Sequence, residues 1–180
     1  MSSPSKRWLT AHLPHPIAQA HDVPWHVYLL EEHKEKADEV TAGDLVMFFE
    51  IPNVTGVRAT EPKKLSVHNA ADGETLAEEV LYGLGGQTRY LAEVADGEFP
   101  APMPDDAKAF VYPNQSFEDA QKWSCHIPCK NHRRMPRVSI QTIKEDLKIK
   151  KNPNLWGGLI EVTEVEAFDA LVEKFAKDFD

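Results

Sequence analysis

Two cysteines and two histidines stand close together between positions 125 and 132, and both residue types bind zinc. They are Cys125, His126, Cys129 and His132, and Cys and His side chains are the usual zinc ligands. If 123–129 is a strand, Cys125 and Cys129 lie about 13 Å apart at roughly 3.3 Å per residue. That separation is too long for one tetrahedral site and for a disulfide. A bend at Pro128 would shorten it, so zinc stays an open alternative. We expect no metal and no organic cofactor.

A basic segment follows the cysteines and could contact phosphate groups. Residues 122–152 hold nine Lys or Arg and two Asp or Glu, a charge of +7, whereas the remaining chain carries −16. A concentrated basic segment in an acidic protein indicates a directed patch more than general affinity for polyanions. The alternative is an ordinary solvated face. The predicted phosphate-binding residues are Lys130, Arg133, Arg134, Arg137, Lys148, Lys150 and Lys151.

Length and composition favour one folded domain. The chain has 180 residues, 42% hydrophobic and 27% charged, with a formal net charge of −9, which is ordinary for a folded soluble protein. The sequence lacks an apolar run of the roughly 20 residues that a membrane-spanning helix needs. We expect no secretion signal at the N-terminus. Two cysteines fit a reducing cytoplasm better than a disulfide framework.

Short strands with helices between them must position these residues. Strands are expected at 6–13, 45–49, 87–95, 107–112, 123–129, 137–140 and 159–162. The run Leu-Val-Met-Phe-Phe at 45–49 is continuously apolar and predicts the central strand. In 87–95, alternation places Tyr90 on one face and Leu91 on the other. Trp8 is expected in the core.

Four helices are predicted. The first covers 25–36, and the second runs from a cap at Asp72 or Thr75 through Leu84. Capping-box patterns begin the third at Thr142 and the fourth at Thr163. The fourth carries an apolar stripe expected to pack in the core, formed by Val165, Phe168, Leu171, Val172 and Phe175. The fold class is therefore α+β, a small mixed barrel of about five to six strands with flanking helices.

The order of these features resembles the PUA-like superfamily, and within it the EVE and YTH type of domain. The resemblance rests on Arg7-Trp8-Leu9, on Gly43-Asp44-Leu45-Val46 and on Tyr90-Leu91-Ala92-Glu93-Val94. It continues with Pro136-Arg137-Val138-Ser139-Ile140 and with Gly157-Gly158-Leu159-Ile160-Glu161-Val162 before a terminal helix. It implies a single PUA-like domain over 1–180, with loop insertions around 53–72 and 98–118 that do not match cleanly.

The resemblance implies a reader of a single nucleotide base, often a modified one, in DNA or RNA. In such domains aromatic side chains sandwich the base, and a basic rim holds the nucleic-acid backbone. The resemblance implies a role in RNA modification or in the restriction of modified foreign DNA. A flipped base offers an aromatic face and a hydrogen-bonding edge. Stacking on the face and a few hydrogen bonds to the edge can therefore recognise one extra methyl or hydroxymethyl group on the base. The predicted pocket residues are Trp25, Trp123, Trp156, Phe49, Thr10 and His12. Trp156 is expected in the pocket or on its rim, beside the lysines.

Two other classes of function remain open. One is an enzyme acting on a modified nucleoside, similar to ASCH domains or to a glycosylase. The Gly-x-Lys-x-x-Glu-x-Arg pattern of ASCH amidohydrolases is absent, as are Gly-x-Ser-x-Gly, Walker A and His-Glu-x-x-His. The other is a module that binds a basic protein partner. A reader this short would need a partner, such as a nuclease, to act on what it binds.

Overall fold

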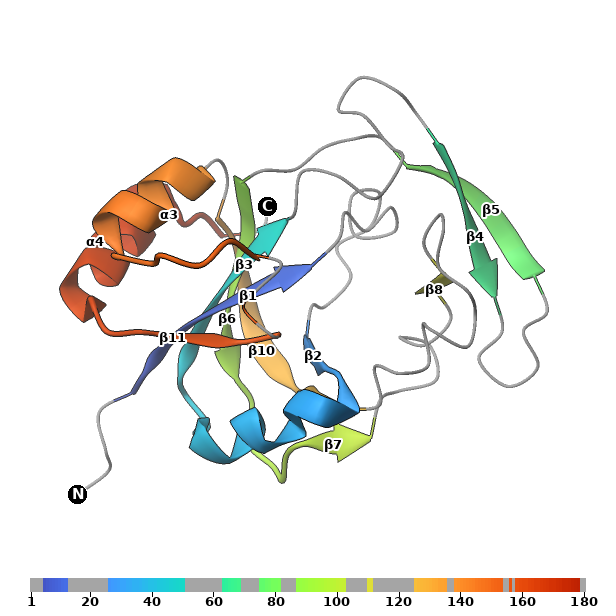
Figure 1. Ribbon diagram of the computed structural model, residues 1–180, viewed down its shortest axis with the longest axis horizontal. Coiled ribbons are helices and arrows are strands. Elements are labelled where there is room, and N and C mark those ends of the chain that lie inside the picture. Colours follow the sequence, from blue (N-terminus) through green and yellow to red (C-terminus); the bar gives the residue numbers. More distant parts are fainter. Residues whose placement is uncertain are drawn as a thin grey trace.

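The computed structural model describes residues 5–12, 26–50, 63–68, 75–81, 87–102, 110–111, 125–135, 138–153, 156 and 158–178. Within these ranges the chain is a mixed α+β protein, as the sequence predicts (Figure 1). Its centre is a five-stranded sheet in the order β10-β6-β3-β1-β11. These strands are β10 (Cys129–Arg134), β6 (Gln87–Val94), β3 (Leu45–Glu50), β1 (Arg7–His12) and β11 (Ile160–Val162).

Strand β3 lies in the middle of this sheet because its residues can be buried on both faces. It pairs in parallel with β1, from Arg7↔Leu45 to His12↔Glu50, and antiparallel with β6. A continuous apolar run suits such a position, since no side chain has to reach water. The prediction of 45–49 as the central strand is confirmed.

Alternate residues of the sheet feed two separate hydrophobic cores. One core takes Phe48 and Tyr90 and the other takes Met47 and Leu91, as the period of two along a strand requires. The first core is completed by η1 (Glu31–Glu39) and by a second sheet in the order β2-β9-β7. The strands of that sheet are β2 (Val27–Leu29), β9 (Cys125–Ile127) and β7 (Ala101–Pro102). Trp8 is 3% exposed in the first core, as expected.

The second core is covered by two helices, α3 (Ile140–Asp146) and α4 (Val165–Phe175), which lie together on one side of the sheet (Figure 1). α4 follows β11 at one sheet edge, and the residues after it reach β10 at the other. There the amide and carbonyl groups of Arg134 and Lys177 exchange hydrogen bonds of 2.7 and 2.8 Å. The five strands described do not close into a barrel, because β10 and β11 are the two edges.

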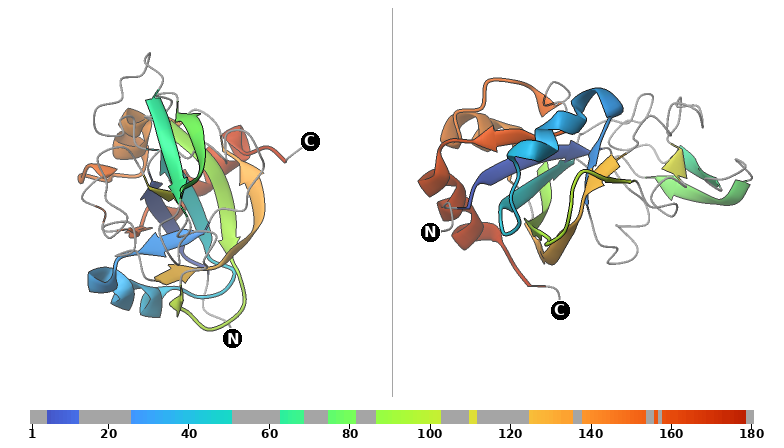
Figure 2. Two further views of the ribbon diagram at one scale, coloured as in Figure 1. Left: turned by 90° about the vertical axis from the view of Figure 1, so that its right-hand side faces the viewer. Right: turned by 90° about the horizontal axis from the view of Figure 1, so that it is seen from below.

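A third sheet, in the order β5-β4-β8, lies at the opposite end of the molecule from α3 and α4, as Figure 1 and the right panel of Figure 2 show. It consists of β4 (Lys63–His68), β5 (Thr75–Leu81) and β8 (Phe110–Val111). The predicted helix through 75–84 is therefore wrong where the structure describes it. β5 pairs with β4 along its length, from Lys63↔Leu81 to His68↔Thr75, and pairing with this preceding strand has outweighed a helical pattern.

Other boundaries also differ from the prediction. Segment 25–36 contains β2 and the start of η1 in place of one helix. α3 begins at Ile140, in the predicted strand 137–140, because the Ser139 hydroxyl accepts a hydrogen bond from the Thr142 amide and caps the helix. Val165, the first residue of α4, is 39% exposed and lies outside the buried stripe.

Candidate nucleic-acid interface

Two of the predicted pocket residues meet in the second core at the end of β3, whereas Thr10, which lies between Leu9 and Ala11 of that core, faces the other side of the sheet. Phe49 is fully buried and Trp156 is 1% exposed, and their rings meet edge to face with centroids 5.8 Å apart. The Thr10 hydroxyl donates a 2.6 Å hydrogen bond to the carbonyl of Gly158. Both rings belong to the second core. Trp156 was expected in the pocket or on its rim; the structure places its ring in the interior against Phe49, which corrects the rim position.

The other predicted pocket residues are less fully described. His12 is in β1, where its backbone pairs with Glu50, and its side chain lies outside the described residues. Trp25, Trp123 and Arg137 also lie outside the described residues. The aromatic pocket expected from the sequence thus keeps Trp25 and Trp123 as its candidate rings.

The turn at 156–159 is fixed by Lys36 as well as by Thr10. The Lys36 ammonium donates to the carbonyls of Trp156 (2.8 Å) and Leu159 (3.1 Å). Burial lowers the pKa of Lys36, and the charge of Lys151 lowers it further. Gly158 has φ +87°, and a Cβ there would lie 2.8 Å from the Leu29 side chain. Sequence reasoning missed Lys36, because a lysine in a charged segment gives no sign that it will cross to a distant turn.

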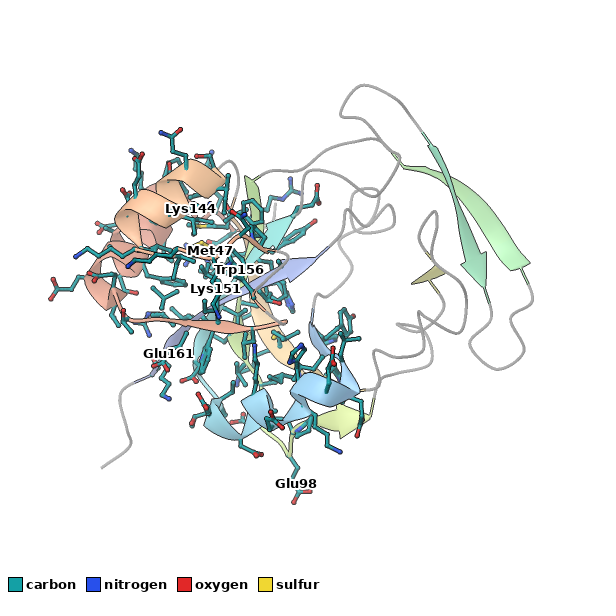
Figure 3. All side chains as sticks on the ribbon, in the orientation of Figure 1. Met47, Glu98, Lys144, Lys151, Trp156 and Glu161 are labelled. Atoms are coloured by element: carbon teal, nitrogen blue, oxygen red, sulfur yellow. The ribbon has the colours of Figure 1, made fainter. Side chains whose placement is uncertain are left out.

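The lysine loop, which we define as Lys148, Lys150 and Lys151, presents its charges to solvent. All three are exposed, while Ile149 between them is buried in the second core. Lys148 has φ 54°, an uncommon backbone state for a residue other than glycine. The Trp156 indole N–H donates to the carbonyl of Lys151 at 3.0 Å, and Figure 3 shows both side chains. Ile149 anchors the loop in the core, and the hydrogen bond from Trp156 holds the backbone at Lys151. Together they keep the lysine side chains at the surface, where an anionic ligand could reach them.

Charge pairing differs within the lysine loop. Lys148 lies 3.4 Å from Glu164. Among the described ion pairs, Lys150 and Lys151 have no acidic partner. Lys144 of α3, also labelled in Figure 3, donates to the side chain of Asn152. Within the lysine loop, the positive charge without a described acidic partner therefore lies at Lys150 and Lys151.

The basic residues of β10 form a separate group. Lys130 pairs with Asp96 at 3.2 Å, and Arg133 lies 3.3 Å from Asp178. Arg134 is exposed, and its backbone bridges to Lys177. β10 and β11 are opposite edges of the sheet, with three strands between them. The single basic rim expected over 130–151 is therefore two groups, and the lysine loop lies on the β11 side, next to Glu164.

Four rings meet on the outer face of the second sheet. We call them the ring cluster: His26, Tyr28, His126 and His132. Their neighbours Val27, Leu29, Cys125 and Ile127 point into the first core, so alternation places the rings on the opposite face. The period-two pattern His-Val-Tyr-Leu could have revealed this face, but the prediction of a helix over 25–36 obscured it.

Backbone features hold the ring cluster in place. The amide of Cys129 donates a 2.9 Å hydrogen bond to His26 Nδ1, so a neutral His26 carries its proton on Nε2. His132 follows Asn131, which has φ 53° at an irregularity in the pairing of β10 with β6. The Asn131 side chain donates to Glu93 at 2.7 Å. Such bulges re-aim a side chain, here His132.

The cysteines and histidines do not gather into a zinc site. Cys125 and Cys129 are buried in the first core, whereas His126 and His132 lie on the outer face. Burial raises the pKa of the Cys129 thiol to about 12, which disfavours the thiolate that zinc requires. Among the residues described, no group of three His, Cys, Asp or Glu side chains is arranged to hold a metal ion.

Comparison with known proteins adds no further assignment. No protein-family model matches the chain, and no characterised protein matches it significantly. In the parts of the chain that the structure describes, no helix has the length and apolar character to cross a membrane.

Proposed function

We propose that this protein binds nucleic acid and reads a single modified base, with the lysine loop as its phosphate contact. The observation that supports this most is the loop itself: Lys150 and Lys151 are exposed, close in sequence and without a described acidic partner, although the chain as a whole is acidic. Lysines with no ion pair to break can exchange their counterions for phosphates at little electrostatic cost.

The loop is also well placed for a reader. It follows α3 and is tied by Trp156 to the turn at the ends of β1 and β3. We further propose that the domain is PUA-like, with the open five-stranded sheet as part of its barrel, and that Trp25 and Trp123 supply the rings of the base pocket. The reader class fits the sequence order described above, and each ring stacked on a base would contribute roughly 1–3 kcal/mol. Action on the bound nucleic acid would come from a partner enzyme, and a reducing cytoplasm is the proposed compartment.

Fluorescence anisotropy tests this proposal. Labelled DNA and RNA oligonucleotides carry one cytosine or adenine that is plain, methylated, hydroxymethylated or glucosylated. We expect a preference of about tenfold or more for one modified base, and loss of affinity for all oligonucleotides in Lys150→Glu/Lys151→Glu. Lys174→Glu, a charge reversal on α4, is the matched control and should bind like the wild type. Equal affinity across the panel would contradict base reading, and turnover of a free modified nucleoside would indicate an enzyme instead.

A further inference from the structure

Lys36 brings a fixed ammonium group to the turn that holds the lysine loop. Its Nζ atom lies 2.8 Å from the carbonyl oxygen of Trp156 and 3.1 Å from that of Leu159. Trp156 in turn donates from its indole N–H to the carbonyl of Lys151 at 3.0 Å, and the two side chains lie close together in Figure 3. Lys36 of η1 and Lys151 of the lysine loop, which are distant in sequence, are therefore joined through one residue.

The Lys36 ammonium has one more donor than the turn uses. A protonated lysine has three N–H groups, and the two carbonyls of the turn accept two of them. Within the part of the chain that the structure describes, Lys36 makes no ion pair and no third hydrogen bond. Because two backbone bonds already fix the ammonium, it loses little further freedom when its remaining N–H contacts a ligand.

The charge of Lys36 is opposed by its surroundings. Burial lowers the pKa of Lys36 and the charge of Lys151 lowers it further, while Glu39 and Glu35 act in the opposite direction without outweighing them. Lys151 itself is exposed and has no acidic partner among the described ion pairs. Two cations thus lie within electrostatic reach of each other, and an anion between them would relieve their repulsion.

A phosphate group suits two neighbouring ammonium groups. Its oxygens can accept hydrogen bonds from both lysines at once, and lysine binds phosphate through a compact point charge. The nucleic acid of the proposed function carries such a group at every nucleotide. A phosphate is therefore the ligand that the charge and the donors of this pair fit.

We propose that Lys36 and Lys151 together hold one phosphate of the bound nucleic acid beside the turn at 156–159. This inference rests on the proposed function and adds a phosphate-binding residue outside the basic segment 122–152. Lys36 supplies a fixed cation and Lys151 an exposed one. η1 completes the first core, whereas Ile149 anchors the lysine loop in the second. The nucleic-acid backbone therefore crosses the turn that joins the two.

Lysine NMR tests this in the wild-type protein, through the signals of the methylene group next to each Nζ. The probe is inorganic phosphate, and sodium chloride and sodium acetate at the same ionic strength are the references. We expect phosphate to shift the signals of Lys36 and Lys151 with one common affinity, and chloride to leave them unchanged. Lys34 of η1, which pairs with Glu31, is the matched control and should not respond. Acetate acting as strongly as phosphate would overturn the phosphate assignment and would indicate a carboxylate of a protein partner.

Oligonucleotide binding separates failure of this site from failure of the proposed function. Lys36→Met should weaken binding about fivefold or more, because a charged hydrogen bond is lost, whereas Lys34→Met should bind as the wild type does. If Lys36→Met binds normally while Lys150→Glu/Lys151→Glu does not, the Lys36 contact is wrong and the proposed function stands. If the wild type binds no oligonucleotide, both are overturned. Should Lys36→Met also loosen the turn, the wild type decides, and a Lys36 signal that phosphate does not shift would overturn the inference.

Discussion

The carboxylate of Asp44 accepts a hydrogen bond from the indole N–H of Trp8 at 2.9 Å, in the interior of the protein. Asp44 is 1% exposed, and it also accepts from the backbone amides of Lys6 (2.8 Å) and Thr41 (2.9 Å). Three donors thus surround a buried negative charge. Asp44 directly precedes β3, Lys6 directly precedes β1, and Trp8 is the second residue of β1, so these bonds fix where the parallel pair begins.

Replacing Asp44 by alanine should destabilise the protein strongly. Asp44→Ala would leave three buried or partly buried N–H groups without their acceptor, which we expect to cost ~2–5 kcal/mol in the free energy of unfolding. Urea denaturation followed by tryptophan fluorescence measures this. The control is Asp169→Ala, which removes a surface carboxylate 2.7 Å from Arg7 and should cost less than about 1 kcal/mol. Equal losses would mean that the Asp44 network is not a stabilising feature.

Alanine substitutions at Gly158 and Gly43 can separate the effect of close packing on stability from the effect of backbone strain. Both have positive φ, +87° and +90°, so alanine at either position should cost about 1–2 kcal/mol. A new Cβ at Gly158 would lie 2.8 Å from Leu29 Cδ2, whereas one at Gly43 would meet nothing within 4 Å. Gly158→Ala should therefore be less stable than Gly43→Ala by about 1 kcal/mol or more. Thermal unfolding of the two variants compares them, and equal melting temperatures would contradict the close approach.

Cys129 should be unreactive in the folded protein and should make stability depend on alkaline pH. Burial raises its pKa from 9.0 to about 12, so the folded state keeps the thiol proton after the unfolded chain has lost it. The stabilisation is complete below pH 9 and is lost as pH rises toward 12. In Cys125→Ala, Ellman's reagent at pH 8 should label Cys129 only after denaturant is added. Rapid labelling of the native protein would contradict this.

Much of the main sheet could be predicted because burial leaves a pattern in the sequence. The continuous apolar run of β3 arises because both faces of that strand are buried. The alternation in β6 arises because its successive residues point into two separate cores. β5 was mistaken for a helix because its apolar residues fit a helical period. Its partner β4, which fixes it as a strand, lies only six residues before it, but in the stretch 53–72 that was expected to be a loop insertion.

The candidate site was harder to predict than the fold. Residue type drew attention to the lysines at 148–151, but charge alone could not show that Lys130 and Arg133 of β10 are paired with Asp96 and Asp178. Trp156 was expected in the pocket or on its rim because large apolar residues in a glycine turn are unusual. The structure gives another reason for a large apolar residue at position 156: its ring contacts Phe49 in the second core.

Removing the Lys36 ammonium should loosen the turn that it holds. Lys36→Met keeps the aliphatic length but loses hydrogen bonds to the carbonyls of Trp156 and Leu159, which we expect to cost about 1–2 kcal/mol. Denaturant unfolding measures the loss. Lys34→Met is the control, because Lys34 pairs only with the nearby Glu31 at the surface, and it should change stability by less than about 0.5 kcal/mol. Similar stabilities of the two variants would show that Lys36 does not fix the turn.

The salt dependence of binding tests whether the lysine loop contacts phosphates directly. Each phosphate contact adds about 0.7 (single strand) to 0.9 (duplex) to the slope of log affinity against log salt concentration. Lys150→Met/Lys151→Met should therefore make that slope shallower by about 1.4 to 1.8, because both charges are exposed and unpaired among the described ion pairs. Lys130→Met/Arg133→Met removes two charges that already face Asp96 and Asp178, so its slope should change less. A larger change in this second variant would move the phosphate contact from the lysine loop to β10.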